Sequence, residues 1–331
     1  MLIPNHMHQY FLPLWLVIGL VAILWPAWKV RNWKQVTCSA ASIILAACAY
    51  ALLLSDDFSM LPYCFGAFAL GGWVLMRKFG AFDPSFAAKK LLSYYFTAMF
   101  LFFCAECCIS HLRFGTLLVL VAFCILGASY PFHGWIEHFF IHAPSCLVSA
   151  FLLFFRPAVW FFTLQFLSTF IPVEDHRFLR IFCMILGIWS CFFVPVLFFS
   201  KKENRKLLGY MVCWQNGILW LVLPYCKVYN YVFLFEFSLI QSISLALLFL
   251  CFIETQRQLN GDDTMGIRAT YRFSKLRACV ILATLTSFKL WPLLICYLVH
   301  ASYYCVTYCA ISCALYLCFV FRAFILNFIG I

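Results

Sequence analysis

Charged side chains are scarce in this sequence. They make up 11% of its 331 residues, while 66% of the residues are apolar. A soluble domain has about 25% charged residues and about half apolar ones, so the composition excludes a soluble protein. The longest stretch between apolar segments, residues 254–277, is also too short for a soluble domain, and we predict a single transmembrane domain.

Acidic residues are the scarcest charged class, with 12 against 23 lysines and arginines, which leaves a net charge of +11. Nucleic-acid binding would gather this charge in one patch. Most of it instead lies in loops after odd-numbered apolar segments, for example at Lys201, Lys202 and Arg205. By the positive-inside rule these loops face the cytoplasm or the matrix. We therefore expect contact with membrane lipids, with cardiolipin as a candidate, and no nucleic-acid partner.

Apolar segments long enough to cross a bilayer recur along the whole chain. No lysine or arginine precedes the first of them, so we expect no cleavable signal peptide. We predict eleven transmembrane helices, at residues 10–30, 36–55, 58–76, 91–112, 114–130, 144–172, 181–200, 207–226, 231–253, 278–299 and 301–328.

Most of the 19 cysteines lie inside these apolar segments, where we expect them to act as small packing residues. Cys104, Cys107 and Cys108 form a cluster, but no second cysteine or histidine pair stands at the spacing of a metal site. We therefore predict no metal or redox centre there.

The sequence YPFHGW at residues 130–135, followed by HAP at residues 142–144, interrupts the apolar pattern. Its prolines and glycine predict a broken helix, and polar groups at membrane depth usually mark a pathway or a site. His138 and His142 are four residues apart, a spacing that membrane metal enzymes use. Such enzymes also need further histidine clusters, and the remaining histidines are scattered, so a histidine-dependent membrane enzyme is the weaker alternative.

Four sequence blocks occur in a fixed order. They are DFSMLP at residues 57–62, PFHGW at 131–135 with a proline at 144, ENRKLLGY at 203–210, and LATL at 282–285 followed by LWP at 290–292. Together they resemble the antiporter-like subunits of respiratory complex I, most of all NADH dehydrogenase (ubiquinone) subunit 4. The resemblance runs from about residue 50 to about residue 320.

The resemblance implies an all-α, polytopic membrane fold of two inverted repeats, each with a broken helix. The breaks would lie near Pro131 and Pro292. Residues 1–56 would form N-terminal helices, residues 57–172 the first repeat and residues 181–331 a truncated second repeat. Compared with the family, the bundle would be trimmed at both ends.

The family's proton path is only partly present when it is carried over residue by residue. Asp57 matches the acidic residue of the third span, although its position before an apolar run also suits a helix N-cap. His133 matches the motif histidine. One family lysine falls on Leu126 and the next on Pro157, beside Arg156, whose guanidinium keeps its proton near neutral pH.

Two further family histidines fall on Gln215 and Gln241, which can order water but cannot take up a proton. The family glutamate falls on Val299, beside His300, and Lys289 lies well inside a predicted span as a substitute charge. We predict no catalytic, cofactor-binding or metal-binding residue in this chain. The proton-path candidates are Asp57, His133, Arg156, Gln215, Gln241, Lys289 and His300.

The resemblance implies a membrane-arm subunit of NADH:ubiquinone reductase (H+-translocating). The chain itself would hold no cofactor and do no redox chemistry, and its partners would be other membrane-arm subunits. It would lie in the mitochondrial inner membrane, or alternatively in a bacterial plasma membrane. Both a rewired proton path and a scaffold that no longer pumps stay open. The alternatives are subunit 2 of the same complex, a cation/proton antiporter and a membrane hydrogenase subunit.

Overall fold

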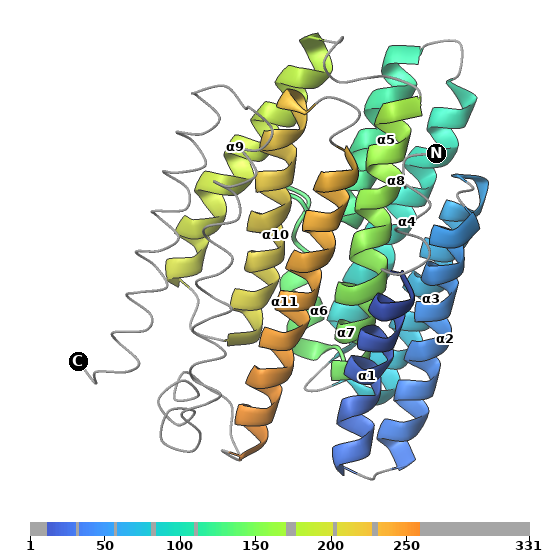
Figure 1. Cartoon of the computed structure of the whole chain (residues 1–331), viewed down its shortest axis with the longest axis vertical. Coiled ribbons are helices and arrows are strands. Elements are labelled where there is room, and N and C mark those ends of the chain that lie inside the picture. The colour runs from blue at the N-terminus through green and yellow to red at the C-terminus, as the bar shows by residue number, and fades with distance from the viewer. Residues whose placement is uncertain are drawn as a thin grey trace.

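The computed structural model describes residues 12–30, 33–55, 58–80, 84–108, 112–169, 177–200, 204–226 and 231–258. In this part of the chain every element is helical, as the long apolar segments predict. The helices run side by side in one bundle (Figure 1). The predicted spans 278–299 and 301–328, and with them the expected break near Pro292, lie outside the described residues.

The first part of the bundle is a series of helices joined by short connections. Each packs on the next, α1 on α2, α2 on α3, α3 on α4 and α4 on α5, because short connections make successive helices antiparallel neighbours. Their bounds are α1 Leu12–Val30, α2 Trp33–Ser55, a 3-10 turn Phe58–Met60, α3 Leu61–Phe79, α4 Pro84–Cys107 and α5 Leu112–Leu126.

The second part begins with a short helix and a long composite rod. The rod was predicted as one span at residues 144–172. The structure describes it as one element over residues 145–169, with a π-helical turn that ends two residues before Pro157. Two long helices, α9 and α10, then pack along each other. The bounds are α6 Ile136–His142, α7 Ser145–Ala150, the π-helix Phe151–Phe155, α8 Arg156–Thr169, α9 Arg177–Ser200, α10 Asn204–Val222, a 3-10 turn Leu223–Tyr225 and α11 Tyr231–Gln258.

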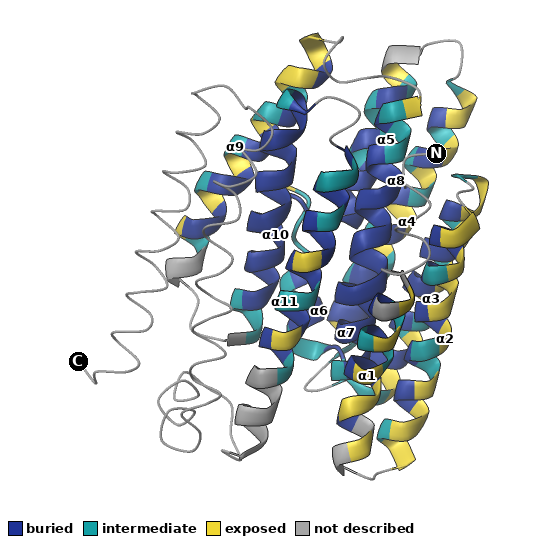
Figure 2. Ribbon diagram, in the orientation of Figure 1, coloured by how far each residue is buried: buried dark blue, intermediate teal, exposed yellow. Residues whose placement is uncertain are grey.

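The core of the bundle is the rod from α7 to α8 together with α10. The most apolar stretch of the rod is buried along its whole length, and that of α10 is almost as deeply buried. Figure 2 shows α8 and α10 mostly in the dark blue of buried residues, while α2, α3 and α9 carry many exposed residues, in yellow. Polar side chains on the rod or on α10 are therefore enclosed by other helices.

The predicted break at Pro131 is confirmed between α5 and α6. The backbone leaves the helix with Ala128 at a φ of 56°, a conformation that non-glycine residues rarely adopt. Two indoles hold the broken segment in place. Trp135 donates its ring N–H to the Ile125 carbonyl at 3.0 Å, and Trp220 of α10 donates to Ser129 Oγ at 2.8 Å. The Ile125 carbonyl and the Ser129 hydroxyl at the break are thus bonded inside the bundle, as a membrane requires of polar groups.

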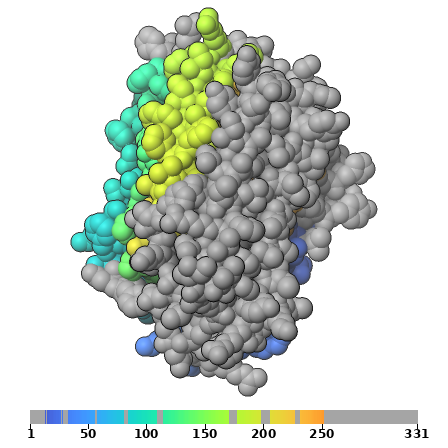
Figure 3. All heavy atoms as spheres, turned by 90° about the vertical axis from the view of Figure 1, so that its left-hand side faces the viewer, coloured from blue at the N-terminus to red at the C-terminus, as the bar shows by residue number. Residues whose placement is uncertain are grey.

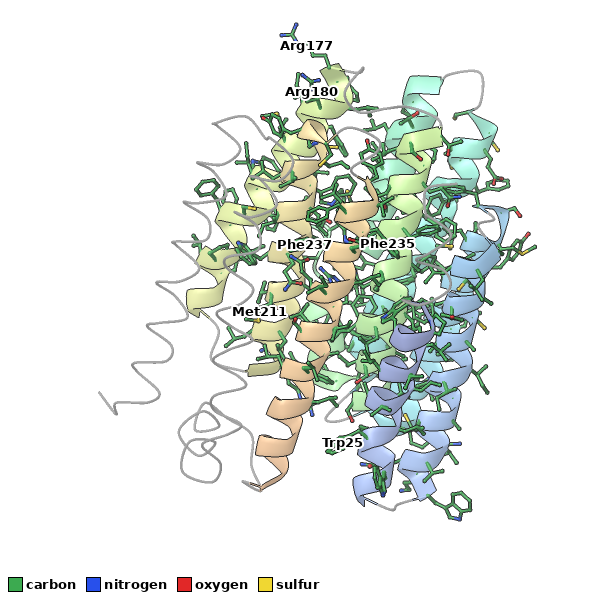
Figure 4. All side chains as sticks on the ribbon, viewed as in Figure 1. Trp25, Arg177, Arg180, Met211, Phe235 and Phe237 are labelled. Atoms are coloured by element: carbon green, nitrogen blue, oxygen red, sulfur yellow. The ribbon has the colours of Figure 1, made fainter. Side chains whose placement is uncertain are left out.

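The outer surface has the character of a membrane protein. Seven helices in the described ranges are long and apolar enough to span a bilayer. On α9 the exposed apolar side chains recur every three or four residues, among them Ile181, Ile185 and Trp189, and Figure 3 shows this helix lying open along one face. Arg177 and Arg180 lie at one end of the bundle and Trp25 near the other (Figure 4). Exposed apolar side chains between the two ends, with arginines at one end and a tryptophan near the other, fit an outer surface that faces lipid.

Candidate functional site

A fully buried arginine lies at the centre of the bundle. Arg156 begins α8 directly after the π-helix and has 0% of its surface exposed. A π-helical turn inside an α-helix is rare and often occurs at functional sites, because it changes the direction of the side chains that follow it. Here it immediately precedes a charge in the middle of an apolar rod.

Among the residues that the structure describes, every hydrogen-bond partner of the Arg156 guanidinium is neutral. Nη1 donates to Ser242 Oγ at 2.7 Å, and more weakly to the Ser238 carbonyl at 3.5 Å. Nη2 donates to Asn216 Oδ1 at 3.2 Å and to Gln241 Oε1 at 3.3 Å. The charge therefore rests on amide and hydroxyl oxygens from α10 and α11.

Asn216 connects this charge to the broken helix. Its side-chain oxygen also accepts the Trp160 indole N–H at 2.9 Å, and its side-chain nitrogen donates to the Gly127 carbonyl at the end of α5. The free carbonyls at a helix C-terminus carry a partial negative charge. The Asn216 amide therefore links the guanidinium to the negative end of α5 through two hydrogen bonds.

Of the predicted proton-path residues, the structure brings Arg156 and Gln241 into contact. Gln215 is buried on α10, and its neighbour Asn216 is the one that contacts Arg156. The described residues do not include Asp57, Lys289 or His300.

His133 belongs to a second group of polar residues, at the break and on α6. Its ring stacks on Tyr130 at a centroid distance of 4.9 Å and lies 5.8 Å from the ring of Tyr210. Tyr210 donates its hydroxyl proton to Glu137 Oε2 at 2.7 Å, and the other carboxylate oxygen of Glu137 lies 3.4 Å from His138 Nε2. This group joins α6 to the start of α10.

His138 and His142 share one face of α6, as their spacing predicts. Their rings stack at a centroid distance of 6.4 Å. Burial lowers the pKa of His138 below its usual value, and the positive charge of Lys90 lowers it further, while the Glu137 carboxylate opposes both. Within the described ranges no three metal-ligating side chains come together.

The sequence contained a signal for Asn216 that was missed. The resemblance indicates Gln215, because a family histidine aligns with it. An asparagine in an apolar span is just as costly to bury, so Asn216 could have been predicted as a site residue as well. Ser242 and Trp160 carry no comparable signal, because serine and tryptophan are common in membrane helices. Their roles depend on which helices pack together.

Comparison with known proteins places this geometry in context. The sequence profile of the family described as NADH:quinone oxidoreductase/Mrp antiporter, TM, matches residues 89–329, a range that contains both polar groups. No curated protein matches the sequence.

Several solved structures share the fold. A chain of respiratory complex I from Thermus thermophilus with bound aureothin has a TM-score of 0.74 at 15% identity, covering 95% of this chain and 75% of that one. A chain of the Mrp complex from Dietzia sp. DQ12-45-1b has a TM-score of 0.69 at 14% identity, covering 95% and 73%. A chain of the archaeal membrane-bound sulfane sulfur reductase has a TM-score of 0.67 at 15% identity, covering 81% and 61%.

Proposed function

Because the chain belongs to the NADH:quinone oxidoreductase/Mrp antiporter transmembrane family, we propose that it is a membrane-arm subunit of a complex I-type NADH:quinone oxidoreductase. It is an antiporter-like integral membrane subunit of the kind found in complex I and Mrp assemblies. The four ordered sequence blocks support the subunit 4 branch. For such a subunit we propose the mitochondrial inner membrane. Its partners are then the neighbouring subunits of that arm.

We further propose that the centre of this subunit holds a fixed positive charge instead of a proton-relaying lysine. The observation that carries this proposal is Arg156, buried among neutral partners at the place beside the family lysine. A proton relay needs a group that releases its proton near neutral pH, and a guanidinium does not.

A permanent charge also opposes proton passage close to it. A second positive charge about 6 Å away would be disfavoured by about 3 kcal/mol at an effective dielectric constant of about 20. Fixed cations and helix dipoles exclude protons from other membrane pores in this way. The function that this geometry supports best is a structural and electrostatic member of the membrane arm, with no proton relay through Arg156.

The experiment compares Arg156→Lys and Arg156→Gln in the assembled complex, reconstituted in vesicles. NADH oxidation and the number of protons translocated per NADH are measured together. We expect Arg156→Lys, which keeps the charge but not the forked donors, to assemble better than Arg156→Gln. The proton ratio of the assembled complex should be unchanged in both. A lower proton ratio despite normal assembly and NADH oxidation would show that Arg156 takes part in pumping.

Purification of the tagged chain in mild detergent tests its membership of a redox assembly. Co-purification with NADH-dependent quinone reduction supports the proposal. Recovery of the chain in an assembly that exchanges cations for protons, without NADH oxidation, would favour the cation/proton antiporter alternative.

A further inference from the structure

Two cysteines outside both polar groups meet inside the bundle. Cys38 on α2 and Cys146 on α7 are 108 positions apart in the sequence, yet their sulfur atoms lie 2.9 Å apart. Both side chains are buried, with 2% and 4% of their surface exposed. Both are free thiols. Two helices thus hold two reduced sulfurs in direct contact.

The separation of the two sulfurs suits a covalent bond better than a shared metal ion. Disulfide sulfurs are about 2.05 Å apart, so the pair would have to close by about 0.9 Å. Two thiolates on a tetrahedral zinc ion, each about 2.3 Å from the metal, stand about 3.8 Å apart. The pair would have to open to admit zinc, and the described residues offer no third ligand beside it.

The pair lies at the end of the bundle that carries the basic loops. Cys38 is one turn after Lys34 in the first part of α2, and Cys146 is the second residue of α7, just beyond Pro144. By the positive-inside rule this end faces the cytoplasm or the matrix. Thiols are kept reduced in those compartments, so a disulfide here would form transiently and be reduced again.

We propose that Cys38 and Cys146 form a reversible disulfide with hydrogen peroxide as the oxidant. Peroxide is small and uncharged, which a nearly inaccessible pair requires. The first sulfur attacks a peroxide oxygen, becomes a sulfenic acid and releases one water. The second sulfur then displaces the hydroxyl group as another water while the S–S bond forms. Two electrons pass from sulfur to oxygen, and both thiol protons leave in the water.

The bond would fasten α2 to the start of the rod that carries Arg156. α7 continues through the π-helix into α8, so Arg156 lies ten positions after Cys146 on one continuous element. α7 also packs on α1, and further along the rod Trp15 of α1 stacks on Phe154 of the π-helix at a centroid distance of 5.3 Å. Oxidation would therefore pin the central rod to the N-terminal helices at the basic end.

The test uses the intact complex, treated with hydrogen peroxide and then unfolded in the presence of N-ethylmaleimide. Digestion and mass spectrometry should find a peptide pair joined through Cys38 and Cys146, which dithiothreitol separates. On a non-reducing gel the oxidised chain should run faster, because the cross-link closes a loop of about 108 residues in the unfolded chain.

Cys38→Ser and Cys146→Ser should each abolish the joined peptides and the faster band. Cys64→Ser is the matched control, because Cys64 is a buried thiol on the neighbouring helix α3, and it should leave both unchanged. The proposal fails if Cys38 and Cys146 are recovered as separate alkylated residues from peroxide-treated complex in which exposed Cys107 is oxidised. It also fails if each is oxidised to a sulfinic acid without a cross-link, or if the pair resists peroxide and carries a bound metal ion.

Discussion

The side-chain oxygen of Asn216 lies 3.2 Å from Nη2 of Arg156 and joins α10 to the start of α8. A buried charge is costly unless its donors are bonded. Asn216 accepts from one of these donors with its oxygen and uses its nitrogen to bond the end of α5. One neutral side chain thereby holds together the charge, the rod and the helix break.

Replacement of Asn216 by alanine should destabilise the chain strongly. It removes the acceptor of both Arg156 and Trp160 and the donor to Gly127, and each buried polar group left unpaired costs about 1–3 kcal/mol. We expect a lower unfolding temperature and a lower yield of assembled complex, measured by thermal unfolding of the purified assembly. Asn216→Asp keeps an acceptor next to the guanidinium and should be milder. Equal thermal stability of Asn216→Ala and the unmodified complex would contradict this role.

Two serines on α11 form a matched pair for testing the contact to Arg156. Ser242 accepts from Nη1 at 2.7 Å, whereas Ser244 donates back to the Ile240 carbonyl of its own helix. Ser242→Ala should lower the unfolding temperature, since a hydrogen bond to a charged group contributes about 1.5–3 kcal/mol. Ser244→Ala should change it little. If the two variants unfold at the same temperature, the Ser242 contact contributes nothing to stability.

Much of the fold could be predicted from the sequence, because membrane helices must be long, apolar and internally bonded. The predicted spans from 10–30 to 231–253 each overlap a helix, and YPFHGW correctly marks the break. Their bounds are less accurate, since α4 begins at Pro84 instead of residue 91 and α5 ends at Leu126 instead of residue 130. Because a charge inside an apolar span is costly, the sequence also implies that Arg156 has a partner. It could not indicate which one, because the partners come from α10 and α11, 60 to 86 positions away.

The π-helical turn Phe151–Phe155 escaped prediction for a different reason. Its five apolar residues suit an α-helix equally well. Pro157 lacks the N–H that would bond the Leu153 carbonyl in an α-helix, which indicates an irregularity in the rod but does not specify a π-turn. The contact of Cys38 with Cys146 was also missed. Single cysteines in apolar spans look alike in the sequence, and only the packing of α2 on α7 distinguishes this pair.

The pKa of His138 should shift in opposite directions when its charged neighbours are removed. Apart from burial, Lys90 on α4 and Lys206 on α10 lower it by their positive charge, and Glu137 on α6 raises it. Lys90→Gln should therefore raise this pKa, and Glu137→Gln should lower it. The pH dependence of His138 modification by diethyl pyrocarbonate, followed by mass spectrometry, measures both shifts. Unchanged profiles in both variants would contradict the electrostatic coupling.

The same lowered pKa has a consequence for stability. The folded chain binds a proton at His138 less readily than the unfolded chain, in which the pKa is near 6.5. Stability from this residue is therefore present above pH 6.5 and is lost as the pH falls towards the lower pKa of the folded state. His138→Gln should weaken the decline of the unfolding temperature below pH 6.5. An identical decline in the variant would rule out a contribution from His138.

Close contact between α9 and α10 depends on a glycine. A Cβ atom at Gly187 would lie 2.6 Å from the backbone nitrogen and Cα of Leu221, and backbone atoms of a packed helix cannot move aside as a flexible side chain can. Gly187→Ala should force the two helices apart. Overpacking of this kind costs about 1–3 kcal/mol, which thermal unfolding of the assembled complex should register as a lower midpoint.

Gly66 on α3 is the matched control for this substitution, because a Cβ atom there meets nothing within 4 Å. In a helix, alanine is favoured over glycine by about 0.5–1 kcal/mol, so Gly66→Ala should leave the midpoint unchanged or raise it. A lower unfolding midpoint in Gly187→Ala and an equal or higher one in Gly66→Ala would distinguish a steric effect at Gly187 from a general effect of replacing glycine in a membrane helix. If both variants lower the midpoint equally, the approach of Gly187 to Leu221 is not what limits the packing of α9 on α10.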